Sequence, residues 1–598
     1  MYEHLLVGLA CIIAFAIGAS WLAWRLRLPS ILLLLLFGFV AGPATGILKP
    51  DELFGDLLSP IVSLSVAIIL FEGGLSLRVK ELREVGNVVR NLVSIGALAT
   101  WIIVAGAAHL ILDFGFEMSL LLGAIMVVTG PTVIVPLLRH IRPIGQVGTI
   151  LKWEGIVIDP IGAMLAVLVF EGILIGELQH AATMAAIGIG KTIAIGGIFG
   201  VVSAAIVIML MRKFWVPDFL QNAMALMILV VSFTASNLLQ PESGLLTSTV
   251  MGIVLANQRV VHVKDIIEFK ENLRVLLISG LFVLLAARVH IEDLGKIGLG
   301  TIAFLAIVIF VARPVSVAIS TFSSALDWRE RFFLCCMAPR GIVAAAISSV
   351  FALRLAETDL PHMDLLVPLT FVAIVSTVAI YGLAASPVAR WLNLAEPNPQ
   401  GVLIVGAHPL ARAIARALQE ADYNVLLVDT NRSEIYRARL EGLPTFHASI
   451  LSDYFLDKVN LGGMGRIMAL TSNDEINSFS VLQFEEVFGR AEVYQLIAEG
   501  EEKGNRETIA HHLHGRHLFG SGMTYYALQE HFMAGAKIKK NRLTEEFDYD
   551  AFREMYGDNA IPLFLIDKDG DLRVFTTDVI LSPKPGQTLI SLTRELNA

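Results

Sequence analysis

Long runs of apolar residues fill the first part of the chain, and shorter alternating runs fill the rest. A helix of about 20 apolar residues crosses the hydrocarbon layer of a membrane, which is roughly 30 Å thick. From Gly401 onward, short apolar runs alternate with charged helical patterns, as in a soluble α/β domain. The pattern therefore predicts a polytopic α-helical membrane protein followed by an α/β Rossmann-like domain. The roughly thirteen spans that this criterion gives are 4–24, 29–48, 59–77, 89–112, 118–139, 147–174, 186–211, 220–240, 243–258, 271–289, 297–319, 332–353 and 364–388.

The composition agrees with a membrane protein. Of the 598 residues, 55% are hydrophobic and 17% are charged, and the mean hydropathy is +0.69. The net charge of −9 gives no basic surface for a nucleic-acid partner. Cys11, Cys335 and Cys336 lie in apolar runs and match neither a disulfide framework nor a metal site. The first apolar run lacks the cleavage site of a signal peptide, so we expect it to remain as a span.

Basic residues gather in one alternate set of the predicted loops, and the positive-inside rule places that set in the cytoplasm. Because the number of spans is odd, the two termini lie on opposite sides of the cell (inner) membrane. We expect the N-terminus on the outer side and the C-terminal domain in the cytoplasm. The basic set is Arg25, Arg27, Arg78, Lys80, Arg83, Arg90, Arg139, Arg142, Arg212, Lys213, Arg259, Lys264, Lys270, Arg329, Arg331 and Arg390.

Two spans contain helix-breaking residues. The fifth holds Thr129-Gly130-Pro131, and the twelfth holds Pro339-Arg340-Gly341. Interruptions at corresponding places in two halves are typical of inverted-repeat transporters, in which two broken helices cross at the substrate site. The two interrupted spans are seven spans apart, so they cross the membrane in opposite directions, as an inverted repeat requires. Simple kinks, which Gly and Pro also cause in transmembrane helices, are the alternative.

The sixth span contains two carboxylates, Glu154 and Asp159. A charge at mid-bilayer costs at least ~2.5–3.5 kcal/mol, so each should have a partner or a function. The two acids are five residues apart, about 140° around a helix, and cannot face the same direction. Arg340 is a cation near the middle of an apolar span and should pair with a carboxylate. We therefore expect a structural Glu154–Arg340 ion pair, which leaves Asp159 facing a cavity.

Some assignments in this region stay open. Glu154 and Asp159 could exchange roles, and Arg340 could lie at the cytoplasmic interface instead of inside the protein. Glu72 either lines the ion path or caps the end of its own span.

A lone carboxylate in a partly dry cavity can carry either a proton or a monovalent cation, because desolvation disfavours the bare ionised form. Alternating between these two neutral forms moves no net charge. An uncompensated charge would couple to the membrane potential at ~2.3 kcal/mol per 100 mV. We expect electroneutral exchange at Asp159, with no cofactor for transport and no metal beyond the transported Na⁺ or K⁺.

These motifs, in this order over residues 1–390, resemble the monovalent cation:proton antiporter-1 family of sodium/proton exchangers. The resemblance implies that Asp159 binds the ion, that Thr129 contributes a ligand, and that Glu154 pairs with Arg340. Two positions depart from the family pattern, which usually has Asp at position 130 and Asn at position 158. Gly130 and Ile158 leave Asp159 in place but put the choice between Na⁺ and K⁺ in doubt.

The soluble part begins with a strand–helix–strand pattern. The apolar run 401–406 ends in Gly406, and a second strand ends in Asp429. An acid about 20 residues past the glycine suits a ribose diol. The glycine fingerprint is degraded, because only Gly406 remains, with His408 as a loop residue where a second glycine is usual. The predicted nucleotide-binding residues are Gly406, His408, Asp429, Asn431, Asn473 and Asp474.

This part resembles the RCK, or TrkA-N, nucleotide-binding domain. The resemblance implies an adenine nucleotide as regulator, and Asp429 favours NAD, AMP, ADP or ATP over NADP. A domain that has lost its ligand and only dimerises is the alternative. The predicted domains are 1–392 for exchange, 393–400 as linker, 401–515 for nucleotide binding and 516–598 as a small lobe.

Three functions compete. The first is a cation/proton antiporter, expected as a homodimer in membrane lipid, and the second is a nucleotide-gated cation channel or uptake system. A channel filter supplies rings of carbonyls or charges, whereas here one Asp lies at a predicted crossing. The third function is that of an oxidoreductase, which the four-residue spacing of Tyr454 and Lys458 would support. These two residues follow Asp429 too closely for a short-chain dehydrogenase. The sequence favours the antiporter and no enzyme activity.

Overall fold

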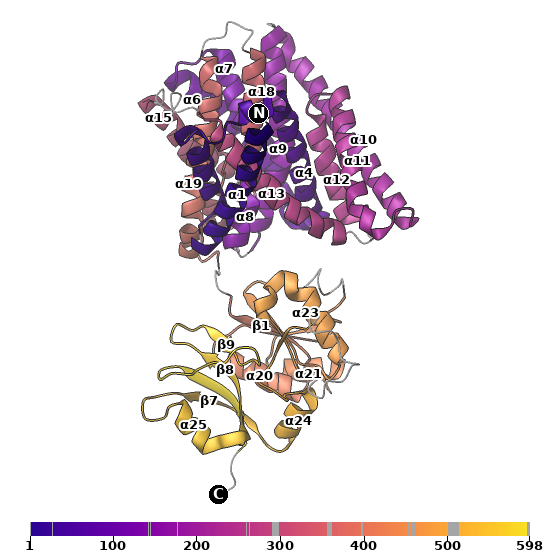
Figure 1. Ribbon diagram of the computed structural model, residues 1–598, viewed down its shortest axis with the longest axis vertical. Coiled ribbons are helices and arrows are strands. Elements are labelled where there is room, and N and C mark those ends of the chain that lie inside the picture. The colour runs from indigo at the N-terminus through magenta and orange to yellow at the C-terminus, as the bar shows by residue number, and fades with distance from the viewer. Residues whose placement is uncertain are drawn as a thin grey trace. The chain divides into compact units, whose positions relative to one another are not determined.

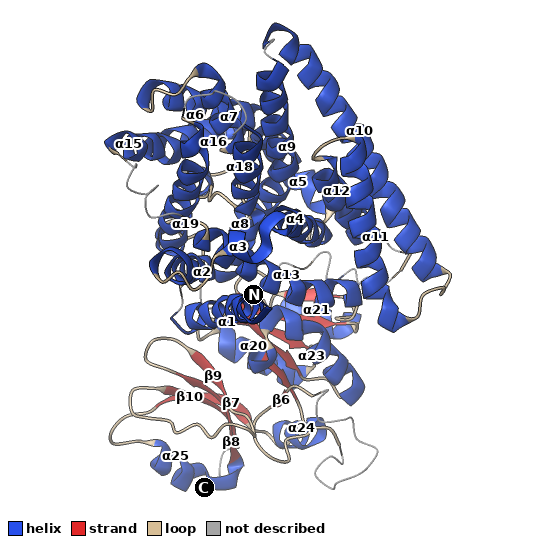
Figure 2. Ribbon diagram, turned by 45° about the horizontal axis from the view of Figure 1, so that its top comes forward, coloured by secondary structure: helices blue, strands red, loops and turns tan. Residues whose placement is uncertain are grey.

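The structure is a computed structural model that describes residues 2–26, 28–141, 143, 145–175, 178–258, 260–261, 264–289, 298–355, 362–395, 399–452, 455, 459, 461–499 and 514–594. They form two compact units, Met1–Pro397 and Asn398–Ala598 (Figure 1). Helices make up the first unit, and the strands of the described residues all belong to the second (Figure 2). Linker residues 396–398, domain residues 500–513, Tyr454 and Lys458 lie outside the described residues.

Each of the thirteen predicted spans coincides with an apolar helix or with two or three consecutive helical segments. Among the described residues, eight helices are long and apolar enough to cross a membrane, and five shorter apolar helices accompany them. The unbroken spans are α1 (Tyr2–Leu26), α2 (Ser30–Phe39) with η1 (Val40–Ala44), α4 (Leu58–Leu75), α5 (Leu82–Asn91) with η4 (Leu92–Gly96) and α6 (Ala97–Ile111), α9 (Val147–Ile175), α10 (Leu178–Arg212), α11 (Asp218–Leu239), α12 (Ser243–Asn257), α13 (Lys264–Ala287), α15 (Leu299–Ile307) with η5 (Val308–Ala312) and α16 (Arg313–Thr321), and α19 (Leu366–Trp391).

The fifth and twelfth spans are broken, as predicted. The fifth consists of α7 (Phe116–Ile125) and α8 (Pro131–Ile141), and the twelfth of α17 (Trp328–Cys335) and α18 (Ile342–Leu355). The fourth and eleventh spans, also seven apart, each contain a π-helical segment, η4 and η5. These two segments lie at the offset of the inverted repeat, whereas a third π segment, η1 in the second span, has no counterpart in α12.

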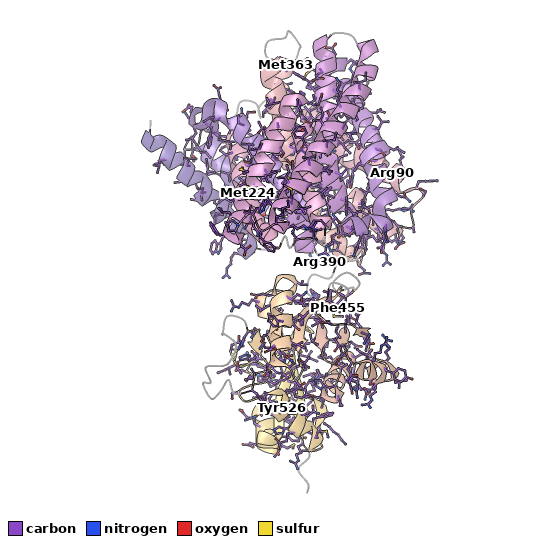
Figure 3. All side chains as sticks on the ribbon, turned by 90° about the vertical axis from the view of Figure 1, so that its right-hand side faces the viewer. Arg90, Met224, Met363, Arg390, Phe455 and Tyr526 are labelled. Atoms are coloured by element: carbon purple, nitrogen blue, oxygen red, sulfur yellow. The ribbon has the colours of Figure 1, made fainter. Side chains whose placement is uncertain are left out.

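Helix α19 runs the full height of this unit. Met363, just before its start, and Arg390, near its end, mark opposite ends of the helical unit (Figure 3). At 1.5 Å per residue its 26 residues measure about 39 Å, more than the hydrocarbon thickness.

The second unit contains two sheets. The first is parallel, in the order β3-β2-β1-β4-β5-β6, which is the Rossmann order. Phe455 packs in its core against the rings of Phe446 and Phe484 (Figure 3). The strands are β1 (Gly401–Val405), β2 (Val425–Asp429), β3 (Thr445–His447), β4 (Met464–Ala469), β5 (Val493–Gln495) and β6 (Arg516–His517), with helices α20 (Pro409–Gln419), α21 (Arg432–Leu440) and α23 (Asp474–Phe488).

The second sheet is antiparallel, in the order β7-β10-β8-β9, and forms a smaller lobe. Phe519, after β6, donates its backbone N–H to Phe575 O at 2.7 Å and so ties this lobe to the parallel sheet. Its elements are α24 (Tyr525–Met533), β7 (Lys537–Arg542), α25 (Tyr549–Tyr556), β8 (Ala560–Ile566), β9 (Leu572–Val574) and β10 (Thr588–Thr593).

Candidate functional site

The two broken spans cross backbone to backbone. Gly130 donates its N–H to Pro339 O at 3.1 Å. A Cβ atom added at Gly130 would collide with Cα of Gly341, and one added at Gly341 would collide with Cα of Gly130. Pro131 begins α8, where its missing N–H costs no helical hydrogen bond. The structure thus brings Gly130, Pro131, Pro339 and Gly341 together where the two broken spans cross.

Asp159 faces this crossing from α9. Gly155, Asp159 and Gly162 are spaced i, i+4 and i+7 and lie on one face of that helix. A Cβ at Gly155 would lie 3.5 Å from Pro131 Cα, and one at Gly162 would lie 3.3 Å from Val128 N. The face that carries Asp159 thus packs against residues 128–131, where the fifth span is broken.

The polar side chains at this point are buried and have no hydrogen-bond partner in the part of the chain that the structure describes. Asp159 is 0% exposed, and neither of its carboxylate oxygens has a hydrogen-bond partner among the described residues. The buried hydroxyls of Thr129 and Thr132 share that condition. Buried polar groups are nearly always paired, and an unpaired one in a native structure points to a catalytic or binding role or to an unseen water or ion.

Arg340 binds backbone carbonyls instead of an acid. Its Nη1 donates to Val127 O and to Val128 O, both at 3.2 Å, and its backbone N–H donates to Thr377 Oγ1 at 3.1 Å. These carbonyls follow α7 at the break, where helical partners are missing. A cation there also offsets the negative end of the helix dipole. Arg340 is 2% exposed, so it lies inside the protein.

The predicted Glu154–Arg340 pair is wrong, because Glu154 pairs with Arg313 at the start of α16. Arg313 Nη1 donates to Glu154 Oε1, and Nη2 donates to Glu154 Oε2 at 3.0 Å. Arg313 Nε also donates to Leu334 O at 2.9 Å, so one side chain joins α9, α16 and α17. Such planar two-point binding of a carboxylate is specific to arginine.

Sequence reasoning could have found Arg313. It lies within the predicted eleventh span, so it is a charge in an apolar run, just as Arg340 is. The sequence indicates that the Glu154 carboxylate needs a basic side chain as its partner, but it does not indicate which residue provides it. The structure resolves the choice, because the break in the fifth span exposes the carbonyls of Val127 and Val128 to Arg340, which leaves Glu154 to Arg313.

Glu72 forms a second buried ion pair. Its Oε1 lies 2.6 Å from Nη1 of Arg274, on α13. Arg274 also lines a cavity of about 310 Å³ beside Pro136 and Leu137 of α8. Glu72 is therefore held by an arginine that borders a space next to one broken span, and the sequence had not singled out that arginine.

In the soluble unit, His408 occupies the turn between β1 and α20. It caps α20, where Nδ1 accepts the N–H of Ala411 at 3.5 Å, and Nε2 donates to Leu470 O at 2.7 Å. This pattern requires the neutral imidazole, and burial lowers the pKa of His408. Its ring also meets the ring of Tyr525 edge-on, with centroids 5.1 Å apart.

The other predicted nucleotide residues mainly hold the backbone. Asp429 accepts the N–H of Ala407 and the N–H of Asn431, each at 2.8 Å. Asn431 and Asn473 cap α21 and α23. Asp474 accepts the N–H of Glu499 at 3.1 Å.

These residues do not fit a nucleotide phosphate at the β1–α20 turn. In a dinucleotide-binding turn, the second glycine lets the pyrophosphate approach the backbone. Here that position is His408, whose Cδ2 lies 3.4 Å from the place of a Cβ at Gly406 and whose Nε2 reaches across to the end of β4. Gly406 keeps the positive φ of +110° that the turn needs. The backbone of a phosphate-binding turn is present, but it carries the His408 side chain at the position of the second glycine.

Comparison with known proteins adds two domain matches. The family model described as "Sodium/hydrogen exchanger, transmembrane" matches residues 12–391, and the TrkA-N domain model matches residues 402–511.

Relatives of the chain include two antiporters. The K⁺/H⁺ antiporter NhaP of Alkalimonas amylolytica is 26% identical over 404 residues, which cover 66% of this chain and 68% of that protein. The Na⁺/H⁺ antiporter 1 of Methanocaldococcus jannaschii is 24% identical over 352 residues, which cover 57% of this chain and 81% of that protein.

Among solved structures, the sodium proton antiporter MjNhaP1 of M. jannaschii superposes with a TM-score of 0.57 at 22% identity. The match covers 65% of this chain and 99% of the other. At this identity the superposition establishes a shared fold.

Proposed function

Because the chain belongs to the sodium/hydrogen exchanger family of membrane transporters, we propose that it exchanges a monovalent cation, Na⁺ or K⁺, for protons at Asp159. The observation that carries this proposal is the fully buried carboxylate of Asp159, which has no partner among the described residues and lies at the crossing of two broken spans. In this setting the bare carboxylate is costly, so it binds either a proton or a cation.

Exchange follows from that competition. A proton and a cation cannot occupy Asp159 together, so release of one to a given side of the membrane allows the other to bind. Thr129 supplies a neutral oxygen beside the carboxylate. Both loaded forms carry the same net charge, and transport is electroneutral. Arg340 and the Glu154–Arg313 pair hold the helices in place.

Two cavities flank the repeat-related half-helices and support alternating access. The cavity beside α8 measures about 310 Å³. A second cavity, of about 190 Å³, lies beside α18 and is lined by Ser348, Ser349 and Arg288. Arg288 is paired with Asp51 at 3.0 Å. We assign the two cavities to access from opposite sides of the membrane, in line with half-helices that occupy equivalent places in the two repeats.

In the cell, we place the protein in the inner membrane as a homodimer, with the N-terminus outside. The soluble unit then lies in the cytoplasm and regulates exchange. A nucleotide such as NAD, AMP, ADP or ATP could act on it only after His408 has left the β1–α20 turn, because the ring fills the phosphate position.

The test is proton flux in proteoliposomes that carry the full-length protein and a trapped pH dye. An outward or inward gradient of Na⁺ or K⁺, imposed separately, should drive proton movement that Asp159→Asn abolishes. Collapsing the potential with the permeant anion thiocyanate, which leaves the cation gradient in place, should leave the rate unchanged. Asp56→Asn, at an exposed position, is the matched control. Flux that persists in Asp159→Asn would refute the role of Asp159, and flux that follows the potential would refute electroneutrality.

A further inference from the structure

The hydroxyl of Thr132 lies where a side chain at position 130 would begin. Its Oγ1 is 3.3 Å from the place of a Cβ at Gly130 and 3.5 Å from the place of a Cβ at Gly341. The family pattern usually has Asp at position 130, but the close contact of Gly130 with Gly341 leaves no room for one here. An oxygen is therefore present close to the position of the missing acid, but it comes from Thr132.

This hydroxyl also lacks the bond that threonines in helices usually make. A helical threonine commonly donates to the carbonyl four residues before it. For Thr132 that carbonyl is Val128 O, which precedes the break and accepts from Arg340 instead. Eight other threonines of the helical unit do make the bond: Thr45, Thr100, Thr234, Thr247, Thr249, Thr321, Thr370 and Thr377.

Thr132 is 3% exposed, so water at the protein surface does not satisfy its hydroxyl. Thr129 and Asp159 are in the same condition beside the same break. Asp159, Thr129 and Thr132 thus offer three buried side chains with oxygens beside one break, none with a hydrogen-bond partner among the described residues. Carboxylate and hydroxyl oxygens are ligands that a hard cation takes.

We propose that Thr132 is a cation ligand that replaces the acid missing at position 130 and thereby sets the selectivity of the site. The proposal rests on exchange at Asp159. With Thr132 and Thr129 as neutral ligands, Asp159 is the sole charged ligand, so the field at the cation is weak. Na⁺ is hydrated more strongly than K⁺, so its dehydration costs more free energy. A weak field at the site offsets this cost for K⁺ better than for Na⁺. The site is then selective for K⁺.

The test compares Thr132→Val with wild type in the proteoliposome assay. Valine keeps the shape and removes the hydroxyl, so the half-saturating K⁺ concentration should rise about tenfold, as expected for one lost polar contact. The rate at saturating K⁺ should change little. Thr132→Ser should restore the wild-type value. Thr370→Val, which removes a buried hydroxyl bonded to Leu366 O, is the matched control and should leave the half-saturating concentration unchanged.

A second measurement does not depend on flux. Added K⁺ should raise the melting temperature of the detergent-solubilised wild type and of Thr132→Ser, but much less that of Thr132→Val. An unchanged half-saturating concentration and an unchanged K⁺ effect on melting in Thr132→Val would overturn the role of Thr132. A wild type with a lower half-saturating concentration for Na⁺ than for K⁺ would overturn the selectivity. If Asp159→Asn still exchanges, the proposed function itself fails, whatever Thr132→Val does.

Discussion

Glu154 and Asp159 lie on the same helix, yet their surroundings are opposite. Glu154 is held at two points by Arg313, whereas Asp159 has no partner among the described residues. A buried ion pair with both members present is close to neutral for stability, but the loss of one member leaves an uncompensated charge. The first acid is therefore suited to fix the structure and the second to change its charge.

We predict that Glu154→Gln lowers the stability of the protein by about 3–5 kcal/mol, because it leaves Arg313 buried without an acid. Arg313→Met should cost a similar amount, and the double variant should be markedly more stable than the sum of the two losses predicts. The measurement is a double-mutant cycle on the melting temperature in detergent.

The same cycle with Glu154→Gln and Arg340→Met provides the control. Since Arg340 binds the carbonyls of Val127 and Val128, its loss should add to that of Glu154 with a much smaller coupling. A larger coupling between Glu154 and Arg340 than between Glu154 and Arg313 would contradict the pairing described above.

At this scale the sequence predicts which residues need partners better than it predicts the partners. A charged residue within an apolar run can be recognised in the sequence, and this singles out Glu154, Asp159 and Arg340. The choice between Arg313 and Arg340 depends on where a broken helix exposes carbonyls. That information is tertiary, and no spacing along the chain contains it. Thr132 escaped notice for the same reason, because an ordinary helical threonine looks identical in sequence.

Among the elements, the crossing of the two broken spans depends on two glycines. Gly130 and Gly341 bring their backbones so close that neither tolerates a Cβ, and the Gly130–Pro339 hydrogen bond closes the contact. The half-helices α7 and α8 of one span and α17 and α18 of the other thereby meet at this crossing, next to the face of α9 that carries Asp159.

We predict that Gly130→Ala, and equally Gly341→Ala, abolishes exchange or reduces it at least tenfold. The added methyl group must push the two broken spans apart, and small displacements of a ligand site have large effects on rate. Proton flux and melting temperature should be measured together. Gly197→Ala in α10 is the control, since a Cβ there meets nothing within 4 Å and alanine favours the helix. Wild-type flux in Gly130→Ala would show that the crossing is looser than described.

The elements themselves were largely predictable. The thirteen spans follow from apolar run length, and the two breaks follow from Gly and Pro within a run. The π-helical segments η4 and η5 were not predicted, because a π segment changes only the hydrogen-bond register and leaves the apolar pattern intact. Gly96 in η4 accepts a hydrogen bond from Ser316 Oγ of α16 at 3.0 Å, so η4 joins the fourth span to the eleventh.

For the molecule as a whole, the chain combines a transporter unit with a soluble unit whose phosphate-binding turn is occupied by its own side chain. The strand order and the degraded glycine fingerprint agree with the sequence. The position of the His408 ring does not follow from the sequence, because a histidine at that place could equally have pointed into solvent. Its capping bond, its bond to Leu470 O and the contact with Tyr525 fix it in the turn.

We predict that wild type binds NAD, AMP, ADP and ATP weakly or not at all, and that His408→Gly gains affinity for at least one of them. Glycine restores the second glycine of the fingerprint, removes the ring from the phosphate position and costs only a few tenths of a kcal/mol as a helix cap. Binding should be measured on full-length protein by calorimetry near pH 7.5. Burial holds the pKa of His408 below its ordinary value, so the ring is neutral at that pH and the turn is intact.

His408→Gln is the matched control, because a glutamine keeps the bulk in the turn and can still reach Leu470 O, and it should bind no better than wild type. Exchange rates measured with and without the nucleotide that binds His408→Gly then test regulation. If the nucleotide changes the exchange rate of His408→Gly but not that of wild type, the second unit still regulates exchange. The His408 ring then prevents the nucleotide from acting on the wild type. Tight nucleotide binding by wild type would instead mean that His408 leaves the turn readily. Its two hydrogen bonds would then act as a latch that the nucleotide opens.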